Sequence, residues 1–366
     1  MPALPNAAWW TTGRAALASA ITTAALIILL FTMLVLLLPG EPQVFVEVDL
    51  PDEPLAASPL PVTAGVDGGI VVQAYTEASF AGLSVLPAAA PGEALTPAPD
   101  PALIEVTPAG ELPRIAADGR EPRQAYARPF DKRDDRARLV IIVLNVGLSR
   151  AASEASIHRL PGAVVMAIDP YAVLPEDWAR TARQAGHEII ATISLQAATE
   201  SGEDAGPRAL LATADAQENV QRLVAGLGRF TGYTGVLLRG GAAFGDSIGR
   251  LEPLLRLLRA RGLLLVDSTT TGGSTSPLVS MAGELGLPHV RLDVAIDAVD
   301  ATGIDRQLEA LATVARERSV AVGAIQPTPV ALERLRAFLA ALRAWQFQLA
   351  PVSAAVAGGE MGERRN

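Results

Sequence analysis

The sequence contains no cysteine, and that absence excludes several chemistries at once. Thiolate nucleophiles, disulfides, iron–sulfur clusters and cysteine-based zinc sites all require this residue. Lysine occurs once, at Lys132, and the three histidines are His158, His187 and His289. Aromatic residues make up only 4% of the 366 residues, so a core has to be built from Ala, Leu, Val and Ile. The length suffices for one large domain or two modest ones.

Basic residues are also in deficit. The chain has 30 Lys and Arg against 39 Asp and Glu, a formal net charge of -9. A general nucleic-acid binder needs a basic face that displaces counterions from phosphates. The charge balance therefore argues against nucleic acid as a partner.

One long run without charge, residues 15–38, predicts a transmembrane helix. At a rise of ~1.5 Å per residue, such a helix crosses a hydrocarbon core of ~30 Å. Trp9 and Trp10 precede it, where an interfacial aromatic belt is expected. Arg14 is the only basic residue before the run, and the flank after it is acidic. We therefore expect residues 1–14 in the cytoplasm and the rest of the chain outside.

A cleaved signal peptide is the alternative interpretation of this run. The run is longer than a typical signal-peptide core, and no small-x-small cleavage site directly follows Leu38. We favour an uncleaved single-pass anchor.

The next stretch, residues 39–111, is rich in Pro, Ala and acidic groups. Such a composition cannot bury enough apolar surface to offset the entropy of the chain. We expect a largely disordered linker that carries a folded part away from the membrane. Residues 112–138 are then a lead-in segment, 139–356 the main domain and 357–366 a disordered tail.

In the main domain, apolar runs of strand length alternate with amphipathic helical stretches. The predicted strands are Leu139–Asn145, Ala163–Ile168, Glu188–Ser194, Gly235–Arg239, Leu263–Asp267, Val290–Val294, Val320–Ile325 and Gln348–Val352. The predicted helices include Glu176–Ala185, Asp215–Leu227, Ile248–Ala260, Ile304–Arg318 and Pro329–Trp345; the last has an apolar face and should turn Arg334, Arg336 and Arg343 outward.

This alternation predicts an α/β fold, in which helices surround a parallel sheet. Seven or eight repeats predict that the sheet closes into a (β/α) barrel. Function then belongs at the C-terminal ends of the strands.

Several segments carry a resemblance to a known family. Val140-Ile-Ile-Val-Leu-Asn-Val-Gly-Leu-Ser149 resembles the first strand and loop of the divergent polysaccharide deacetylase family. Further similar segments follow in the same order: Gly186-His-Glu-Ile-Ile, Gly232-Tyr-Thr-Gly-Val, Arg261-Gly-Leu-Leu-Leu-Val-Asp-Ser268, Leu292-Asp-Val-Ala-Ile-Asp297 and Leu349-Ala-Pro-Val-Ser353. The resemblance covers more than half of the chain. It implies a distorted seven- or eight-stranded barrel of the glycoside hydrolase/deacetylase type, similar to NodB-type carbohydrate esterases.

The resemblance also implies a mechanism. In such esterases a divalent metal held by Asp and His side chains polarises the acetamide and activates water. A second Asp removes the proton from that water, and a His returns one to the leaving amine.

This chain departs from that pattern at each expected position. The Asp-Asp pair after the first strand is replaced by Leu144 and Asn145, and the His and Pro-Met-Glu-Pro of the third strand are replaced within Thr192–Ala197. The Asn-Asn-His region of the fourth strand reads Leu237-Leu-Arg239, and the Gly-His-Pro-His-Pro near the seventh reads Ile325-Gln-Pro-Thr-Pro329. Every expected metal-binding His is missing. The resemblance therefore implies a degenerate member, for which we expect no resident cofactor.

Polar side chains at the predicted strand ends remain candidates for a binding cleft: Asn145, Thr192, Gln196, Arg239, Asp267, Ser268, Asp293 and Gln326. The degenerate catalytic positions are Leu144, Asn145, Thr192 and Gln196. Carboxylates alone can bind a hard cation, which makes Asp267, Asp293 and Asp297 an alternative metal site. The other interpretation, which we favour, is that these carboxylates cap loops by accepting backbone N–H bonds. We expect the three histidines to be structural or surface residues.

The leading hypothesis is a periplasmic protein of the cell envelope, anchored in the bacterial inner membrane through residues 15–38. It would be linked to carbohydrate metabolism and be catalytically inactive. It would bind a glycan such as peptidoglycan, or an envelope protein, in the cleft that corresponds to the active site of the family. One alternative is an active deacetylase with a carboxylate-based metal site. Another is a pure scaffold that recruits its partner through helix surfaces.

Overall fold

The computed structural model describes residues 75–83, 94–196, 206–269 and 276–356. Contacts divide the chain into Met1–Val71 and Val72–Asn366, and all described residues lie in the second unit. The predicted cytoplasmic segment 1–14, the transmembrane helix 15–38 and the tail 357–366 lie outside the described residues. Within the four described ranges, no helix is both long and apolar enough to cross a membrane.

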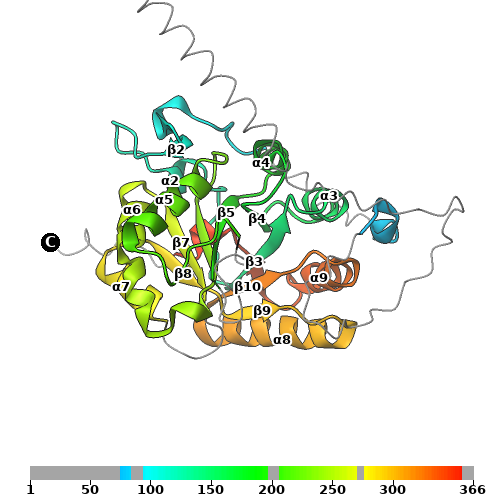
Figure 1. Ribbon diagram of the computed structural model, residues 1–366. Helices are drawn as coiled ribbons and strands as arrows, with labels where there is room; N and C mark the ends of the chain where they lie inside the picture. The colour runs from blue at the N-terminus through cyan, green and yellow to red at the C-terminus, as the bar shows by residue number, and fades with distance from the viewer. Residues whose placement is uncertain (1–74, 84–93, 197–205, 270–275, 357–366) are drawn as a thin grey trace, which may run out of the picture. The chain divides into compact units, whose positions relative to one another are not determined.

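A curled sheet of parallel strands forms the centre of the fold (Figure 1). Its strand order is β8-β7-β6-β5-β4-β3-β10-β9, and β11 pairs with the start of β3. The strands are β3 (Ala137–Val146), β4 (Val165–Ile168), β5 (Ile189–Leu195), β6 (Gly235–Gly240), β7 (Leu264–Ser268), β8 (His289–Arg291), β9 (Val294–Ile296), β10 (Val320–Ile325) and β11 (Phe347–Leu349). The predicted α/β, barrel-like class with a parallel sheet is confirmed, but the sheet is a curled half-barrel of nine strands and not the closed seven- or eight-stranded barrel that was predicted.

The two ends of this strand order are consecutive pieces of chain. β8 and β9 are separated only by Leu292 and Asp293. The Leu292 N–H donates to the Asp267 carbonyl of β7, and the Asp293 N–H donates to the Val322 carbonyl of β10, both at 2.8 Å. The predicted strand Val290–Val294 is therefore split, and its halves border opposite ends of the sheet.

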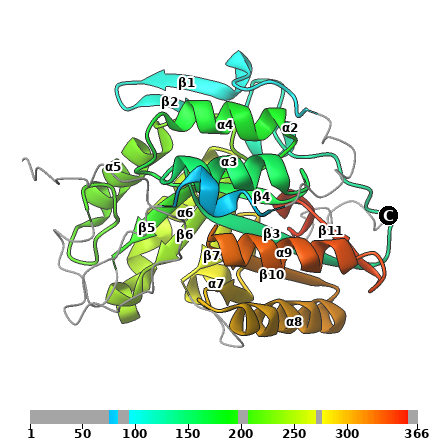
Figure 2. The same cartoon turned by 90° about the vertical axis from the view of Figure 1, so that its right-hand side faces the viewer.

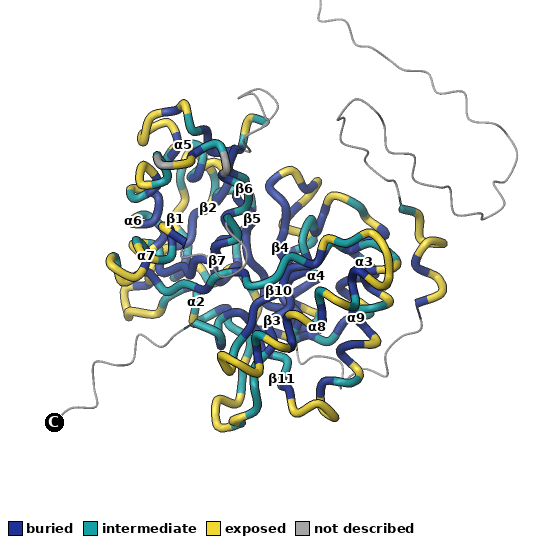
Figure 3. The backbone as a smooth tube through the Cα atoms, turned by 90° about the horizontal axis from the view of Figure 1, so that it is seen from below, coloured by how far each residue is buried: buried dark blue, intermediate teal, exposed yellow. Residues whose placement is uncertain are grey.

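Helices pack around the outside of the sheet. They are α3 (Arg150–Arg159), α4 (Pro175–Gln184), α5 (Ala216–Leu227), η3 (Ala242–Leu251), α6 (Glu252–Ala260), α7 (Pro277–Glu284), α8 (Ala301–Arg318) and α9 (Pro329–Ala341). Figure 3 shows the strands as the buried centre and the helices with exposed outer turns.

Strand alternation separates two apolar clusters. Val140 and Ile142 of β3 belong to an inner cluster with residues of β4 to β8 and β10. Leu139, Ile141 and Val143 instead pack outward with the helices. The apolar face predicted for α9 is confirmed, but Arg336 is buried with it, at 6% exposed, and does not face outward as predicted.

The C-terminal segment covers the inner cluster at the N-terminal ends of the strands. After β11, the Ala350 N–H donates to the Leu139 carbonyl, and Ala350, Val352 and Ala354 join the inner cluster. The predicted strand Gln348–Val352 is thus shorter, and a 3-10 turn (η4, Val352–Ala354) follows it. The polar side chains described below lie at the opposite end of the sheet, at the C-terminal ends of the strands.

Part of the predicted linker is folded. The turn η1 (Glu77–Phe80) lies on α3 (Figure 2), and Arg159 donates to the carbonyls of Phe80 and Leu83. After a second turn (η2, Pro101–Leu103), β1 (Ile104–Thr107) and β2 (Gly110–Pro113) form an antiparallel hairpin, and α2 (Pro122–Ala125) follows. Leu103 is fully buried. Residues 94–111 therefore differ from the predicted disordered linker, because Leu103 packs with Ala116 and Tyr126 of the lead-in segment.

Candidate functional site

Three polar side chains from three strands are bonded to one another at the C-terminal end of the sheet. The Asn145 Nδ2 donates to the Gln326 Oε1 at 2.5 Å, and the Arg239 Nη1 donates to the Asn145 Oδ1 at 2.7 Å. All three were predicted as cleft residues. They stand at positions where the resemblance places metal-binding or catalytic Asp and His residues.

The backbone explains how Asn145 reaches this place. Its φ is 56°, in the left-handed region that few residues other than glycine adopt. The pairing between β3 and β4 shifts between Val143 and Val146, so Asn145 lies in an irregularity of the strand. Asparagine adopts this region more readily than most other residues with a Cβ, so its side chain can turn here without large strain.

The Arg239 side chain crosses the inside of the sheet. β6 and β3 are separated by β5 and β4 in the strand order, so the bond to Asn145 does not join neighbouring strands. Arg239 pairs in register with Ser194 on one side and Ser268 on the other. The guanidinium therefore occupies the interior of the sheet at its C-terminal end.

Two further residues complete the set. Asp169, directly after β4, is buried, and one of its oxygens accepts the Tyr171 N–H at 2.9 Å. Burial raises the pKa of this carboxyl, and the charge of Arg239 partly opposes that rise. Thr192 pairs with the inward-facing Leu237 and is 2% exposed, and its Oγ1 has no hydrogen-bond partner.

We call these side chains, together with Ser268, the polar cluster: Asn145, Asp169, Thr192, Arg239, Ser268 and Gln326. Ser268 is half-buried and donates to the Leu238 carbonyl at 2.9 Å, while Leu144 packs against the inner apolar cluster below. Asp169 was not predicted as a site residue, although an acidic residue directly after a short buried strand was a usable signal.

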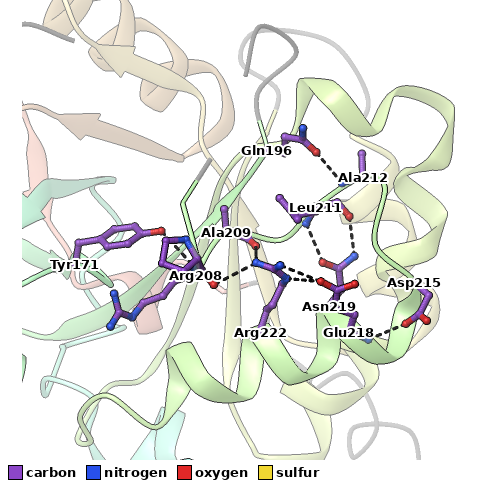
Figure 4. A network of polar contacts seen from close by, with 11 residues as sticks. Tyr171, Gln196, Arg208, Ala209, Leu211, Ala212, Asp215, Glu218, Asn219 and Arg222 are labelled. Atoms are coloured by element: carbon purple, nitrogen blue, oxygen red, sulfur yellow. Dashed lines mark hydrogen bonds and ion pairs between the residues drawn. The ribbon is translucent and has the colours of Figure 1, made fainter. Parts of the chain in front are cut away.

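Gln196 was predicted in the cleft but takes part in a different network. Its Oε1 accepts the Ala212 N–H at 3.1 Å, and Figure 4 shows it in the loop between β5 and α5. Two residues outside this loop bond its backbone: the Asn219 side chain of α5 bonds Leu211, and the Tyr171 hydroxyl after β4 accepts the Arg208 N–H at 3.1 Å. This network shapes a loop beside the polar cluster.

Asp267 points to the outside of the sheet. It is fully buried and accepts bonds from the Thr269 N–H, the Thr269 hydroxyl and the Ser276 hydroxyl. Ser276 is the N-cap of α7. The carboxylate therefore fixes the loop that leads into α7, in agreement with the capping interpretation.

The other two carboxylates of the alternative metal site have separate partners. One Asp293 oxygen accepts the Val322 N–H at 2.9 Å, and the other accepts from Arg318 at 3.1 Å. Asp297 bonds the side chain of Gln307 at 2.7 Å. The structure does not bring Asp267, Asp293 and Asp297 together in one site.

The histidines lie away from the polar cluster. His187 is fully buried before β5, with its ring nitrogens 2.7 Å from the Val164 carbonyl and 2.8 Å from the Ile157 carbonyl. His289 begins β8 and bonds the Leu287 carbonyl at 2.8 Å, and His158 is exposed on α3. These positions agree with structural or surface roles.

The residues of the polar cluster do not fit a divalent metal. In the part of the chain that the structure describes, no group of three His, Asp or Glu side chains could hold one. The Asn145 oxygen that could bind a cation already accepts from a guanidinium. A metal beside Arg239 would meet a like charge, and Asp169 is the one carboxylate in the set.

Comparison with known proteins identifies the family. The sequence pattern of the divergent polysaccharide deacetylase family matches residues 141–356. The chain belongs to this family, and membership indicates a carbohydrate-related function. No curated protein matches the chain.

A solved structure of similar fold is among the matches. An uncharacterized protein of Agrobacterium tumefaciens C58, ATU2773, is 31% identical, with a TM-score of 0.63 over 68% of this chain and 100% of its own. Haloferax volcanii malate synthase (14% identity, TM-score 0.26, 57% of this chain and 74% of its own) and Mycobacterium tuberculosis CitE (14%, 0.25, 57% and 99%) are too dissimilar to carry an argument.

Proposed function

We propose that this protein is a non-catalytic, membrane-anchored binding protein of the cell envelope, in which a deacetylase-type barrel has become a recognition domain. The observation that carries the proposal is the bond between Arg239 and Asn145. In place of a metal and its ligands, the C-terminal end of the sheet holds an arginine cation bonded to Asn145, which in turn bonds Gln326.

The missing chemistry supports this proposal. Deacetylation needs an electrophile for the acetamide, a base for water and an acid for the leaving amine. The polar cluster contains neither histidine nor a pair of carboxylates. The Arg239 guanidinium offers only hydrogen-bond donors and no acceptor, so it cannot serve as the base.

The polar cluster can still recognise a ligand. Arg239 donates to Asn145 from one of its nitrogens, Thr192 presents a buried hydroxyl without a partner, and Gln326 lies at its half-exposed edge. Such groups bind hydroxyl, carbonyl or carboxylate oxygens of a glycan or of an envelope protein. The active-enzyme alternative finds less support, because Asp267 and Asp293 hold loops and strands.

The test uses the full-length chain in detergent or lipid nanodiscs. Acetylated chitin and peptidoglycan fragments are incubated with it in the presence of zinc, manganese or calcium, and released acetate is measured. We expect no acetate above the buffer control. Metal-dependent acetate release that is lost in the Asp169→Asn variant would overturn the proposal.

A further inference from the structure

Exposed apolar side chains gather around the polar cluster. Nine large apolar side chains are exposed among the described residues. Three of them, Val106, Ile115 and Trp345, lie away from the C-terminal end of the large sheet. The other six follow the C-terminal ends of strands, and we call them the apolar rim: Leu148, Tyr171, Val173, Leu174, Val299 and Val330. A concentration of this kind at one end of a domain marks an interaction surface.

The sheet topology places these residues next to one another. They come from the loops after β3, β4 and β9 and from the first turn of α9 after β10. Those strands are consecutive in the sheet, in the order β4-β3-β10-β9, so the apolar rim follows one continuous half of its C-terminal end. A Cβ added to Gly147 would lie 2.4 Å from the Ala172 Cβ, so the first two loops are in contact.

Two adjacent members, Val173 and Leu174, lie in the loop directly before α4. Val173 is 75% exposed and Leu174 is 66% exposed. Leu174 has a φ of 52°, in the left-handed region, and comes directly before Pro175 at the start of α4. A large apolar residue in that conformation and in water is unfavourable on both counts.

The chemistry of the apolar rim favours a polypeptide over a sugar or a lipid surface. Sugars stack on open aromatic faces, and the ring of Tyr171 already carries the Arg208 guanidinium at 5.2 Å. The other members are aliphatic. Next to the apolar rim, Asp297 and Asp300 flank Val299 and would repel an anionic membrane.

We infer that the C-terminal end of the sheet docks a segment of a partner protein, which covers the apolar rim with aliphatic or aromatic side chains and directs a carboxylate to Arg239. This inference rests on the proposed function, because it requires a non-catalytic polar cluster, and it names the class of partner. We infer the partner's acidic group from charge complementarity, because Arg239 is the only cation in the polar cluster.

The experiment selects a random dodecapeptide library on the full-length chain in nanodiscs, after depletion on empty nanodiscs. The enriched sequence is synthesised, and its affinity is measured by fluorescence anisotropy. The test variant is Val173→Ser with Leu174→Gly, since glycine accepts the backbone of residue 174. The matched control is Val106→Ser on the distant hairpin, where the valine is 79% exposed.

We expect an enriched motif with Asp or Glu among apolar residues. Its affinity should fall at least tenfold in the Val173→Ser/Leu174→Gly chain and in Arg239→Gln, and stay unchanged in Val106→Ser. Replacing the acidic residue of the peptide by its amide should cost as much as Arg239→Gln. No enrichment, or binding indifferent to these variants, would overturn the inference.

Two further outcomes would also overturn it and leave the proposed function intact. One is binding of peptidoglycan glycan strands that needs Arg239 and tolerates the rim variants. The other is self-association of the chain through the apolar rim, seen by analytical ultracentrifugation. The proposed function is tested separately by the acetate assay, in which metal-dependent acetate release would contradict it.

Discussion

Glu188 is a buried acid at the end of the sheet opposite the polar cluster. It directly precedes β5, is fully buried, and accepts bonds from the Ser353 hydroxyl and N–H at 3.1 and 3.3 Å. Burial raises its pKa from 4.5 to about 7, against the opposing hydrogen bonds from Ser353. Burial thus favours the neutral form of this side chain, whereas the Ser353 hydrogen bonds that join it to the C-terminal segment favour the carboxylate.

This shift predicts a pH-dependent stability. Because the folded pKa lies above the unfolded value, the contribution of Glu188 is complete below about pH 4.5 and is lost as pH rises through about 7. Glu188→Gln should remove that loss, with a stabilisation over wild type that grows to about 3 kcal/mol at alkaline pH. Denaturant unfolding at pH 5 and pH 8 measures it. An identical pH dependence in both chains would contradict the assignment.

Leu174 allows a second prediction for a single residue. Its left-handed backbone costs roughly 1–2 kcal/mol for a side chain with a Cβ, and glycine avoids this cost. Leu174→Gly should leave the free energy of unfolding unchanged or raise it by up to about 1 kcal/mol. Val173→Gly, at the neighbouring exposed position, should lower it by about 0.5–1 kcal/mol. Thermal and denaturant unfolding distinguish the two; equal losses would show that residue 174 is unstrained.

The alternation of inward and outward side chains along each strand explains which site residues could be predicted. Asn145, Arg239 and Gln326 stand where the family resemblance locates functional groups, and the structure joins them. Asp267 lies at a strand end too, but it is one residue after the inward-facing Val266 and so points outward. Proximity to a strand end was therefore not sufficient, and the alternation within the strand was the missing criterion.

Among the structural elements, residues 94–127, which precede the main domain, depend on one arginine of α4. The buried Arg183 donates to the carbonyls of Tyr126, Gly232 and Thr96, at 3.0, 3.2 and 2.6 Å. Its guanidinium also stacks on the ring of Tyr126 at 5.0 Å. These contacts hold residues 94–127 against the N-terminal end of the sheet.

Arg183→Met should release this segment. Three carbonyls would lose a charged donor, which we expect to cost about 3 kcal/mol or more. Hydrogen–deuterium exchange should show faster exchange over 94–127, while peptides at the polar cluster keep their protection. Arg180→Met is the control, because Arg180 is exposed on the same helix and forms a surface ion pair with Asp177. Unchanged exchange in the Arg183 variant would contradict the role of this arginine.

The helices differ in how far the sequence revealed them. α5, α8 and α9 have apolar faces at helical spacing, and all three were predicted. The predicted starts of α5 and α9 lie within one residue of the observed starts, and the predicted α8 begins three residues late. α3 was not delimited, because it buries Ser153 and Ser156, whose hydroxyls bond carbonyls one turn earlier. The hairpin β1–β2 was missed because its stability comes from distant contacts, such as Arg261 with Glu105 and the Pro113 carbonyl.

For the whole molecule, the proposal requires attachment to a membrane. The full-length chain should sediment with inner membranes and resist extraction at high salt, and a chain without residues 1–38 should be soluble. In spheroplasts, added protease should degrade the main domain, since the charge flanks of residues 15–38 predict that it lies in the periplasm. Protection of the main domain, or release of the full-length chain into the soluble fraction, would contradict the proposed topology.

In the proposed function, Arg239 and not a metal supplies the positive charge at the C-terminal end of the sheet. The direct measurement is the metal content of the purified full-length chain after exposure to zinc, manganese and calcium. We expect no stoichiometric metal in the wild-type chain, because Arg239 already occupies the Asn145 oxygen. One tightly held metal per chain, lost in Asp169→Asn, would contradict the account and restore an active deacetylase as the working function.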